Sequence, residues 1–425
     1  MLGRPAVGPW AMAGRIRDGT GTPRGVGARP TFDAPPPPPY PAASRFGGRG
    51  TGARVAGTSE VVVVGGGVIG CGIAFELARR GVRVTLLERG RLGGEASWAS
   101  AGIVSPPSRP EQRHERVELG NLSLRMYPSL VADLEERTGL SLEYRKPGEW
   151  TIAIDAEHAA HEAAKVAWQQ SLGYPYEAVD PVAARRDEPA LPETTVAAWF
   201  TPEGATVTVQ RLAQAYALAA ERLGATIREE TPAGAVLHDG RRVTGVALNE
   251  GRVDAPLVVL AGGAWTRFLG ESVGVVVPAK PVKGQLIAFR GGESRPTRVI
   301  NGHHGYVRPR VDGTTTVAAT EEEVGFDRRV TGDGVAWLLD LTSKVCPSLL
   351  AGEVVATWTG LRPGSETGEP IIGPVPGWEG LWVATGHFRT GAKEGPATAD
   401  LVARSIVEGA VAPLLVPFAP AGSPA

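Results

Sequence analysis

The hydrophobic pattern of the chain is most regular between residues 60 and 91. Four consecutive valines, residues 61–64, leave no polar position on either side of a strand, which predicts a strand buried on both faces of a parallel sheet. Glycines follow at once, and apolar residues then recur at helical spacing until Gly81, where we expect the helix to end. A second apolar run, 82–87, ends at Glu88. This order predicts a β-α-β unit.

Hydrophobic periodicity predicts further elements along the rest of the chain. Strands interspersed with helices place the protein in the α/β (α+β) class. Helices are predicted over 115–138, 156–172, 209–223, 331–344 and 397–407. Strands are predicted over 149–154, 256–264 and 381–384, within 282–319, and in hairpins around Asp239-Gly240 and Glu250-Gly251.

The glycines after the first strand have the spacing of a dinucleotide-binding turn. Gly65, Gly67 and Gly70 fit G-x-G-x-x-G, in which the glycines make the turn, admit a pyrophosphate and let helix and strand pack closely. Glu88 lies near the roughly 20-residue offset of a carboxylate that binds ribose hydroxyls, which favours FAD or NAD over NADP. The strand over 256–264 also ends in glycines, so Gly262 is expected beside the cofactor.

Composition excludes several classes of protein. The chain has 425 residues, 42% of them hydrophobic, and a net charge of −1, which does not suggest nucleic acid or a membrane surface as a partner. Its two cysteines, Cys71 and Cys346, form neither a disulfide framework nor a metal-binding pattern, so we expect no metal and a reducing, cytoplasmic location. No stretch is apolar enough for a membrane span, and a homo-oligomer is left open.

Residues 1–58 differ in composition from the rest. They contain eight arginines, two aspartates, 10 prolines and 12 glycines, which predicts a disordered head. A targeting peptide, or a true start codon nearer Thr58, would also explain this segment. Residues 411–425 are interpreted as an uninformative tail.

Four segments together resemble a known family. GGEASWASAGIVSP (93–106), YVRPRVDGTTTVAATEEEVGFDRRVT (306–331), TWTGLRPGS (357–365) and GHFRTG (386–391) resemble the ThiO-type glycine oxidases of the D-amino acid oxidase group. The resemblance implies a Rossmann-type FAD-binding domain interleaved with a mixed-sheet substrate domain. The FAD-binding domain would comprise 59–140, 205–270 and 355–410, and the substrate domain 141–204 and 271–354.

The resemblance also implies the cofactor contacts. FAD would contact five parts of the chain: the glycine turn, the ribose end, the small-residue loop, a later strand and the last loop. In addition to Gly65, Gly67, Gly70 and Gly262, these are Val68, Ile69, Glu88, Arg89, Ala96, Ser97, Ala101, Gly102, Ile103, Ala233, His387, Phe388, Arg389, Thr390, Gly391, Ala392 and Lys393.

For the substrate, the resemblance assigns the carboxylate to Arg362, with Tyr306, Arg389 and His304 around it. The implied reaction is oxidative deamination of glycine and other small amino acids, with hydride transfer from Cα to flavin N5 and reoxidation by O₂ to H₂O₂. The imino product would serve thiazole formation in thiamine biosynthesis. No side chain is expected to act as acid or base, because the cofactor carries the chemistry.

Three alternatives differ in function. A dehydrogenase of the same fold would pass electrons to a quinone, an oxidase could prefer sarcosine or D-alanine, and a flavin-binding protein could lack catalysis. The last of these arises because Ala392, Lys393 and Glu394 stand where the family has aliphatic residues. Lys393 could place a positive charge at the flavin, or it could form a solvent-exposed ion pair with Glu394. Arg308, also aliphatic in the family, is a smaller departure.

Overall fold

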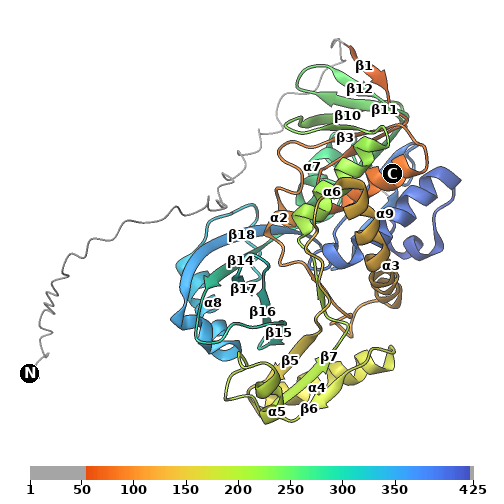
Figure 1. The fold of residues 1–425 in the computed structure, drawn as a ribbon. Coiled ribbons are helices and arrows are strands. Elements are labelled where there is room, and N and C mark those ends of the chain that lie inside the picture. The colour runs from red at the N-terminus through yellow and green to blue at the C-terminus, as the bar shows by residue number, and fades with distance from the viewer. Residues whose placement is uncertain (1–53, 422–425) are drawn as a thin grey trace, which may run out of the picture. The chain divides into compact units, whose positions relative to one another are not determined.

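The computed structural model describes residues 54–421, and its first large element is a six-stranded sheet (Figure 1). All neighbours in this sheet pair in parallel except β19 and β20, which are antiparallel. The four valines of β2 are buried on both faces, as their pattern predicts. In spatial order the strands are β19 (Ile371–Pro374), β20 (Leu381–Thr385), β13 (Leu257–Leu260), β2 (Val61–Val64), β3 (Val84–Leu87) and β9 (Thr226–Arg228).

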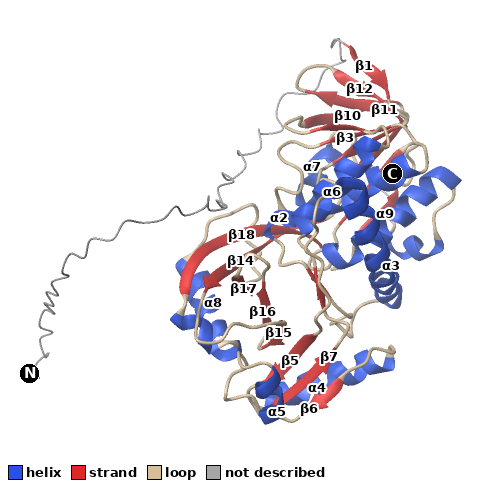
Figure 2. Ribbon diagram, in the orientation of Figure 1, coloured by secondary structure: helices blue, strands red, loops and turns tan. Residues whose placement is uncertain are grey.

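Helices cover one face of this sheet, and a second sheet covers the other. Val61 and Val63 pack towards the helices, whereas Val62 and Val64 pack towards the second sheet. Figure 2 shows α3 (His114–Thr138), α6 (Val209–Arg222) and α9 (Gly391–Glu408) gathered together. The fourth helix, α1 (Val68–Arg79), packs against α6 and α9. The covering sheet consists of β1 (Arg54–Thr58), β12 (Arg252–Asp254), β11 (Arg242–Leu248) and β10 (Ala233–Asp239).

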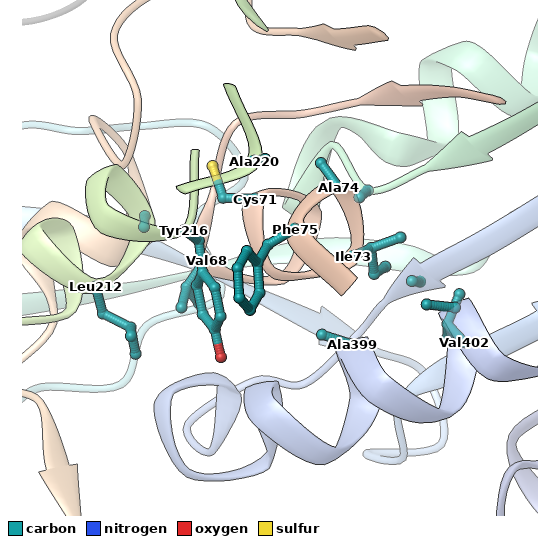
Figure 3. Close-up of a cluster of buried hydrophobic side chains, with 14 of the residues drawn as sticks. Val68, Cys71, Ile73, Ala74, Phe75, Leu212, Tyr216, Ala220, Ala399 and Val402 are labelled. Atoms are coloured by element: carbon teal, nitrogen blue, oxygen red, sulfur yellow. The ribbon is translucent and has the colours of Figure 1, made fainter. Parts of the chain in front are cut away.

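Side chains from three segments far apart in sequence form the core under the helices. Figure 3 shows Phe75 of α1 beside Tyr216 of α6, with Ala399 of α9 close to both. The rings of Phe75 and Tyr216 are 5.6 Å apart, and both residues are almost completely buried. The first helix is therefore fixed by two later helices, which holds the glycine turn at its start.

The other large element is an eight-stranded mixed sheet (Figure 1). Successive side chains along each of its strands point to opposite faces of the sheet, one apolar and one polar. Ile287, Ile300, Val307 and Val317 point to a core that includes Leu338 of α8 (Gly332–Val345). The strands are β18 (Glu353–Ser365), β14 (Ala279–Arg290), β17 (Thr314–Ala318), β16 (Gly305–Pro309), β15 (Val299–Gly302), β5 (Glu149–Ala153), β7 (Ala197–Thr201) and β6 (Glu177–Val179).

Polar side chains occupy the opposite face of the same strands. Tyr306 pairs with Ala318 on β17 and with Asn301 on β15, and residues directly opposite in a sheet share a face. This face contacts elements that follow the dinucleotide turn: Trp358 Nε1 donates to the carbonyl of Ala99, 3.2 Å away. The polar face thus closes over the region where the cofactor is expected.

The remaining elements connect these layers. They are α2 (Ala96–Ala99), α4 (Ala156–Ser171), α5 (Pro181–Asp187), α7 (Thr266–Glu271), the 3₁₀ helices η1 (Gly263–Trp265), η2 (Pro347–Ala351) and η3 (Pro413–Phe418), and the paired strands β4 (Ile103–Val104) and β8 (Ala205–Thr206).

Several sequence predictions need correction. The last long helix starts at Gly391 rather than Ala397, and β18 pairs with β14 along its whole length, so residues 355–365 belong to the eight-stranded sheet and not to the FAD-binding domain. The predicted disordered head lies outside the described residues up to position 53, and its last five residues form β1. In the predicted tail, Leu415 and Phe418 are buried in the core. No helix within residues 54–421 is long and apolar enough to cross a membrane.

Candidate active site

The glycine turn between β2 and α1 has no space for side chains at two of its three positions. Gly65 has φ +120°, and a Cβ on it would collide with the carbonyl of Ala261 at the end of β13. A Cβ on Gly70 would collide with the carbonyl of Gly65. At Gly67 a Cβ would meet only the Ser97 hydroxyl, 3.6 Å away, so the backbone there is open to a ligand. These are the three roles that the motif assigns to its glycines.

Glu88 lies at the carboxyl end of β3, next to this turn. Its Oε2 accepts a hydrogen bond from Gly66 N and its Oε1 from Gly90 N, both at 2.7 Å. Burial raises the pKa of the carboxyl group, while the two amides oppose the shift. The carboxylate is therefore held in place beside the turn, as a ribose acceptor requires.

The other predicted residues at this end lie close by. The Arg89 guanidinium stacks 4.0 Å from the Trp265 ring and pairs with Glu95. Gly262 follows β13, and its amide lies against Gly65. Ala233 begins β10, after a segment in which Thr231 N donates to the carbonyl of Glu88. Parallel strands bring these carboxyl-end residues to one edge of the sheet.

The small-residue loop forms the short helix α2 and the strand β4. The hydroxyl of Ser97, on α2, accepts a hydrogen bond from Val68 N at 3.0 Å, so α2 contacts the first turn of α1. Ala96 and Ala101 are small residues in the same segment, and Ile103 pairs with Thr206 on β8. Gly102 has φ +66°, and a side chain there would collide with the carbonyl of Val207.

The segment 387–390 leads into α9. His387 is buried, and its Nε2 lies 3.0 Å from the hydroxyl of Thr398. Phe388 has φ +53°, and its amide donates to the carbonyl of Pro363, 2.9 Å away. The backbone of this segment is thereby tied to β18, the strand that contains Arg362.

The first turn of α9 provides unpaired amide donors. Thr390 precedes the helix without capping it, so the amides of Gly391, Ala392 and Lys393 have no intrahelical acceptor. Such amides, with the helix dipole, favour an anionic or electron-rich group. Together with the open backbone at Gly67, this arrangement fits the two ends of an FAD molecule.

Lys393 and Glu394 are both buried, with 6% and 1% of their surface exposed, which excludes the solvent-exposed ion pair. Burial lowers the pKa of Lys393 to about 8, against the opposing effect of Glu394. Glu394 pairs instead with Arg116 of α3, at 3.0 Å from Nε to Oε1. The sequence analysis missed Arg116, although it occupies an inward position on the buried stripe of α3 with Gly120, Ser123 and Tyr127.

Arg362 lies on β18 and faces the same side of the sheet as Tyr306. Its Nη1 donates to the carbonyls of Lys283 and Thr320, at 3.3 and 3.1 Å, and no carboxylate of residues 54–421 lies within ion-pair distance. The guanidinium rests on Gly284, where any side chain would displace it. Burial lowers the pKa of Arg362, and its positive charge partly offsets the burial that raises the pKa of Tyr306.

Arg308 lies on β16, two residues after Tyr306 and on the same face of the sheet, and is almost completely buried. Its Nη2 donates to the carbonyl of Val207, 3.4 Å away, and its Nε has no partner in the described part of the chain. Burial lowers the pKa of Arg308 to about 10. This arginine adds positive charge beside Tyr306, which the sequence interpretation treated as a minor departure.

The other two predicted substrate residues lie nearer the surface. The Arg389 side chain is 42% exposed and pairs with Glu321. His304 is exposed in the turn between β15 and β16, with its ring 5.4 Å from the ring of His158 on α4. Their roles toward substrate stay predictions.

Comparisons with known proteins agree with this geometry. The glycine oxidase of Pseudomonas aeruginosa is 36% identical over 368 residues, which cover 86% of this chain and 99% of that protein. The crystal structure of glycine oxidase from Geobacillus kaustophilus superposes with a TM-score of 0.81 at 32% identity, covering 86% of this chain and 98% of that one. The bifunctional protein ThiO/ThiG of Trichormus variabilis is 34% identical, covering 85% of this chain and 54% of that protein.

A protein family described as FAD dependent oxidoreductase matches residues 60–405. The match begins just before β2 and ends within the buried helix α9. The chain therefore belongs to the FAD dependent oxidoreductase family, and its cofactor is FAD.

Proposed function

We propose that this protein is a glycine oxidase that deaminates glycine and other small amino acids. Relatives named glycine oxidase match nearly the whole described chain and support this assignment. Relatives in which the same segment is part of a bifunctional ThiO/ThiG protein support a role in supplying the imine for thiazole formation in thiamine biosynthesis.

The observation on which the proposal depends is the state of Arg362. Arg362 is partly buried, and a cation withdrawn from water without a carboxylate partner is costly unless a ligand supplies the anion. The guanidinium is fixed on one side by two carbonyls and by the bare backbone of Gly284, which leaves the remaining donors for a bidentate contact. An α-carboxylate has the charge and the geometry that such a group binds.

The neighbouring residues restrict the size and polarity of the substrate. Tyr306 and Arg308 extend the polar face beyond Arg362, and Trp358 borders it on the same strand as Arg362. In this arrangement Arg362 holds the carboxylate, Tyr306 lies beside it, and the backbone segment tied to Pro363 orients the two sites relative to each other.

When bound, FAD would supply the electron chemistry, namely uptake of the hydride from the substrate Cα and reoxidation by O₂ to H₂O₂. No side-chain acid or base is assigned. Burial lowers the pKa of His387 to about 4, which keeps this imidazole neutral at physiological pH and makes it a poor acceptor for a substrate proton.

We assign residues 59–140 and 205–270, with 366–410, to the FAD-binding domain. The two blocks 141–204 and 271–365 form the substrate domain, because the strands of the eight-stranded sheet all come from these blocks. The boundary after residue 365 follows from the pairing of β18 with β14.

An anaerobic titration tests the proposed function. Purified holoprotein should lose its flavin absorbance on addition of glycine, and readmission of air should restore the colour with release of one H₂O₂ per glycine consumed. Sarcosine and D-alanine in parallel titrations rank the alternative substrates. Reduction without aerobic H₂O₂ would indicate a dehydrogenase, and flavin that no amino acid bleaches would contradict the assignment.

A further inference from the structure

A single buried arginine connects every segment around the start of α9. Arg116, with 5% of its surface exposed, lies on α3 and is distant in sequence from all of its partners. Nη1 donates to the carbonyl of Gly368 at 2.6 Å, and Nη2 donates to the carbonyl of His387 at 3.2 Å and to the hydroxyl of Thr390 at 2.9 Å. Nε donates to Glu394, so all three guanidinium nitrogens are engaged.

Two of these contacts, with His387 and Thr390, hold the segment 387–390 in place. Thr390 also donates from its hydroxyl to the carbonyl of His387, so Arg116 binds both ends of a closed hydrogen-bonded turn. The residue between them, Phe388, has a positive φ, which is strained for a residue with a side chain and needs outside support. Arg116 supplies that support.

The same turn is shared by the cofactor and substrate sites. The C-terminal end of the turn leads into α9, whose first amides are unpaired. The amide of Phe388 donates to the carbonyl of Pro363, the residue after Arg362. A shift of this turn would therefore move both the amides and the substrate arginine. Glu394 contributes by neutralising the guanidinium, since an unpaired cation at this depth would destabilise the fold.

We propose that Arg116 is a positioning residue for the reaction: with Glu394 as its buried counter-ion, it sets the turn 387–390 so that the amides of α9 meet the flavin and Arg362 meets the substrate. This inference rests on the proposed cofactor role of residues 387–393. It also gives the departure at Glu394 a function, because an aliphatic residue there would leave Arg116 with only Glu369, which is 3.6 Å from Nη1 and 20% exposed, as a counter-ion.

Replacing the pair by apolar residues separates positioning from simple stability. Arg116→Met leaves Glu394 buried and unpaired, and should lower both the thermal stability of the apoprotein and the affinity for FAD. Arg116→Met combined with Glu394→Leu removes both charges, and buried ion pairs are often replaced by apolar residues without loss of stability. We expect the double variant to regain the wild-type melting temperature.

FAD affinity then decides the question. The double variant still lacks the bonds to His387 and Thr390, so its Kd for FAD should stay about tenfold or more weaker than that of the wild type, as expected for lost bonds from a charged group. Anaerobic flavin reduction at saturating FAD and glycine should also be slower.

Glu394→Gln, which keeps the bonds to the turn, should bind FAD more tightly than Arg116→Met. Arg125→Met, at an exposed position of the same helix, is the matched control and should match the wild type.

A double variant that recovers wild-type FAD affinity together with its stability would overturn the proposal, because Arg116 would then serve the fold alone. Equal FAD affinity in Glu394→Gln and Arg116→Met would overturn it as well. These measurements use FAD binding as the readout, so they stay valid if wild-type holoprotein is not reduced by glycine. That result would refute the proposed substrate instead.

Discussion

The two ends of the cofactor site are built in opposite ways. The glycine turn is mostly local: residues 65–70 and Glu88 lie within one β-α-β unit, and the close backbone contacts that fix its shape include one distant segment, Ala261 at the end of β13. The turn at 387–390 is held by Arg116, Pro363 and Glu394, which are brought together only by the fold. A site made of close backbone contacts tolerates almost no added atom, whereas a site made of buried charges tolerates paired changes. The variants below test this difference.

The largest effect is expected at Gly65. Alanine there would have φ +120° and a Cβ in collision with Ala261, so Gly65→Ala should abolish FAD binding and lower the free energy of unfolding by more than about 2 kcal/mol. Gly224→Ala is the matched control, with a positive φ and open space around the Cβ, and should cost about 1 kcal/mol. Urea unfolding and FAD titration measure both. Similar losses in the two variants would show that strain, and not close contact, governs the turn.

Next in size is the loss of Arg362. Arg362→Met removes the charge-assisted contact to the substrate carboxylate, so KM for glycine should rise about 100-fold. The flavin spectrum should be unchanged, because Arg362 is not assigned to FAD. Initial rates of H₂O₂ formation over a range of glycine concentrations provide the measurement. An unaltered KM would remove this arginine from the substrate site.

The pH dependence of stability should report the burial of His387. Its pKa is lowered to about 4 in the folded protein, against about 6.5 in the unfolded chain, so the unfolded state binds the proton first as the pH falls. The free energy of unfolding should therefore decrease between pH 6.5 and pH 4, by about 3 kcal/mol from this residue. His387→Asn should lack this component, and His114→Asn, at an exposed position, should keep it. Parallel pH profiles for wild type and His387→Asn would contradict the assignment.

The smallest effect is expected at Arg389. Its side chain is 42% exposed and pairs with Glu321 at the surface, so Arg389→Met should change the free energy of unfolding by no more than about 0.5 kcal/mol. We expect a rise in KM for glycine of only about threefold, well below that of Arg362→Met. A KM change as large as that of Arg362→Met would mean that Arg389 leaves Glu321 to bind substrate.

The sequence was sufficient where neighbours in the chain are neighbours in space. The order β2, glycines, α1, β3 and Glu88 is confirmed, as is the hairpin at Asp239-Gly240. The same local unit left FAD or NAD open, the resemblance selected FAD, and the family match confirms it.

The sequence was insufficient where distant residues meet. The pairing of Arg116 with Glu394 joins two helices that no local pattern relates, so Glu394 could be interpreted as a surface residue. The helix start at Gly391 was missed because Gly391, Gly395 and Pro396 suggest a loop, yet packing of α3 against this turn stabilises the helix. Likewise, β18 could not be assigned to a sheet before its long pairing with β14 was known.

The two faces of the eight-stranded sheet have a practical consequence for redesign. On β16 the residues that anchor the hydrophobic core alternate with those proposed to face the substrate, as Val307 does with Tyr306 and Arg308. Mutant libraries confined to every second position of these strands would sample new substrate preferences while leaving the core that keeps the enzyme folded unchanged. Libraries shifted by one residue would change the core positions instead and would yield mainly variants that fail to fold.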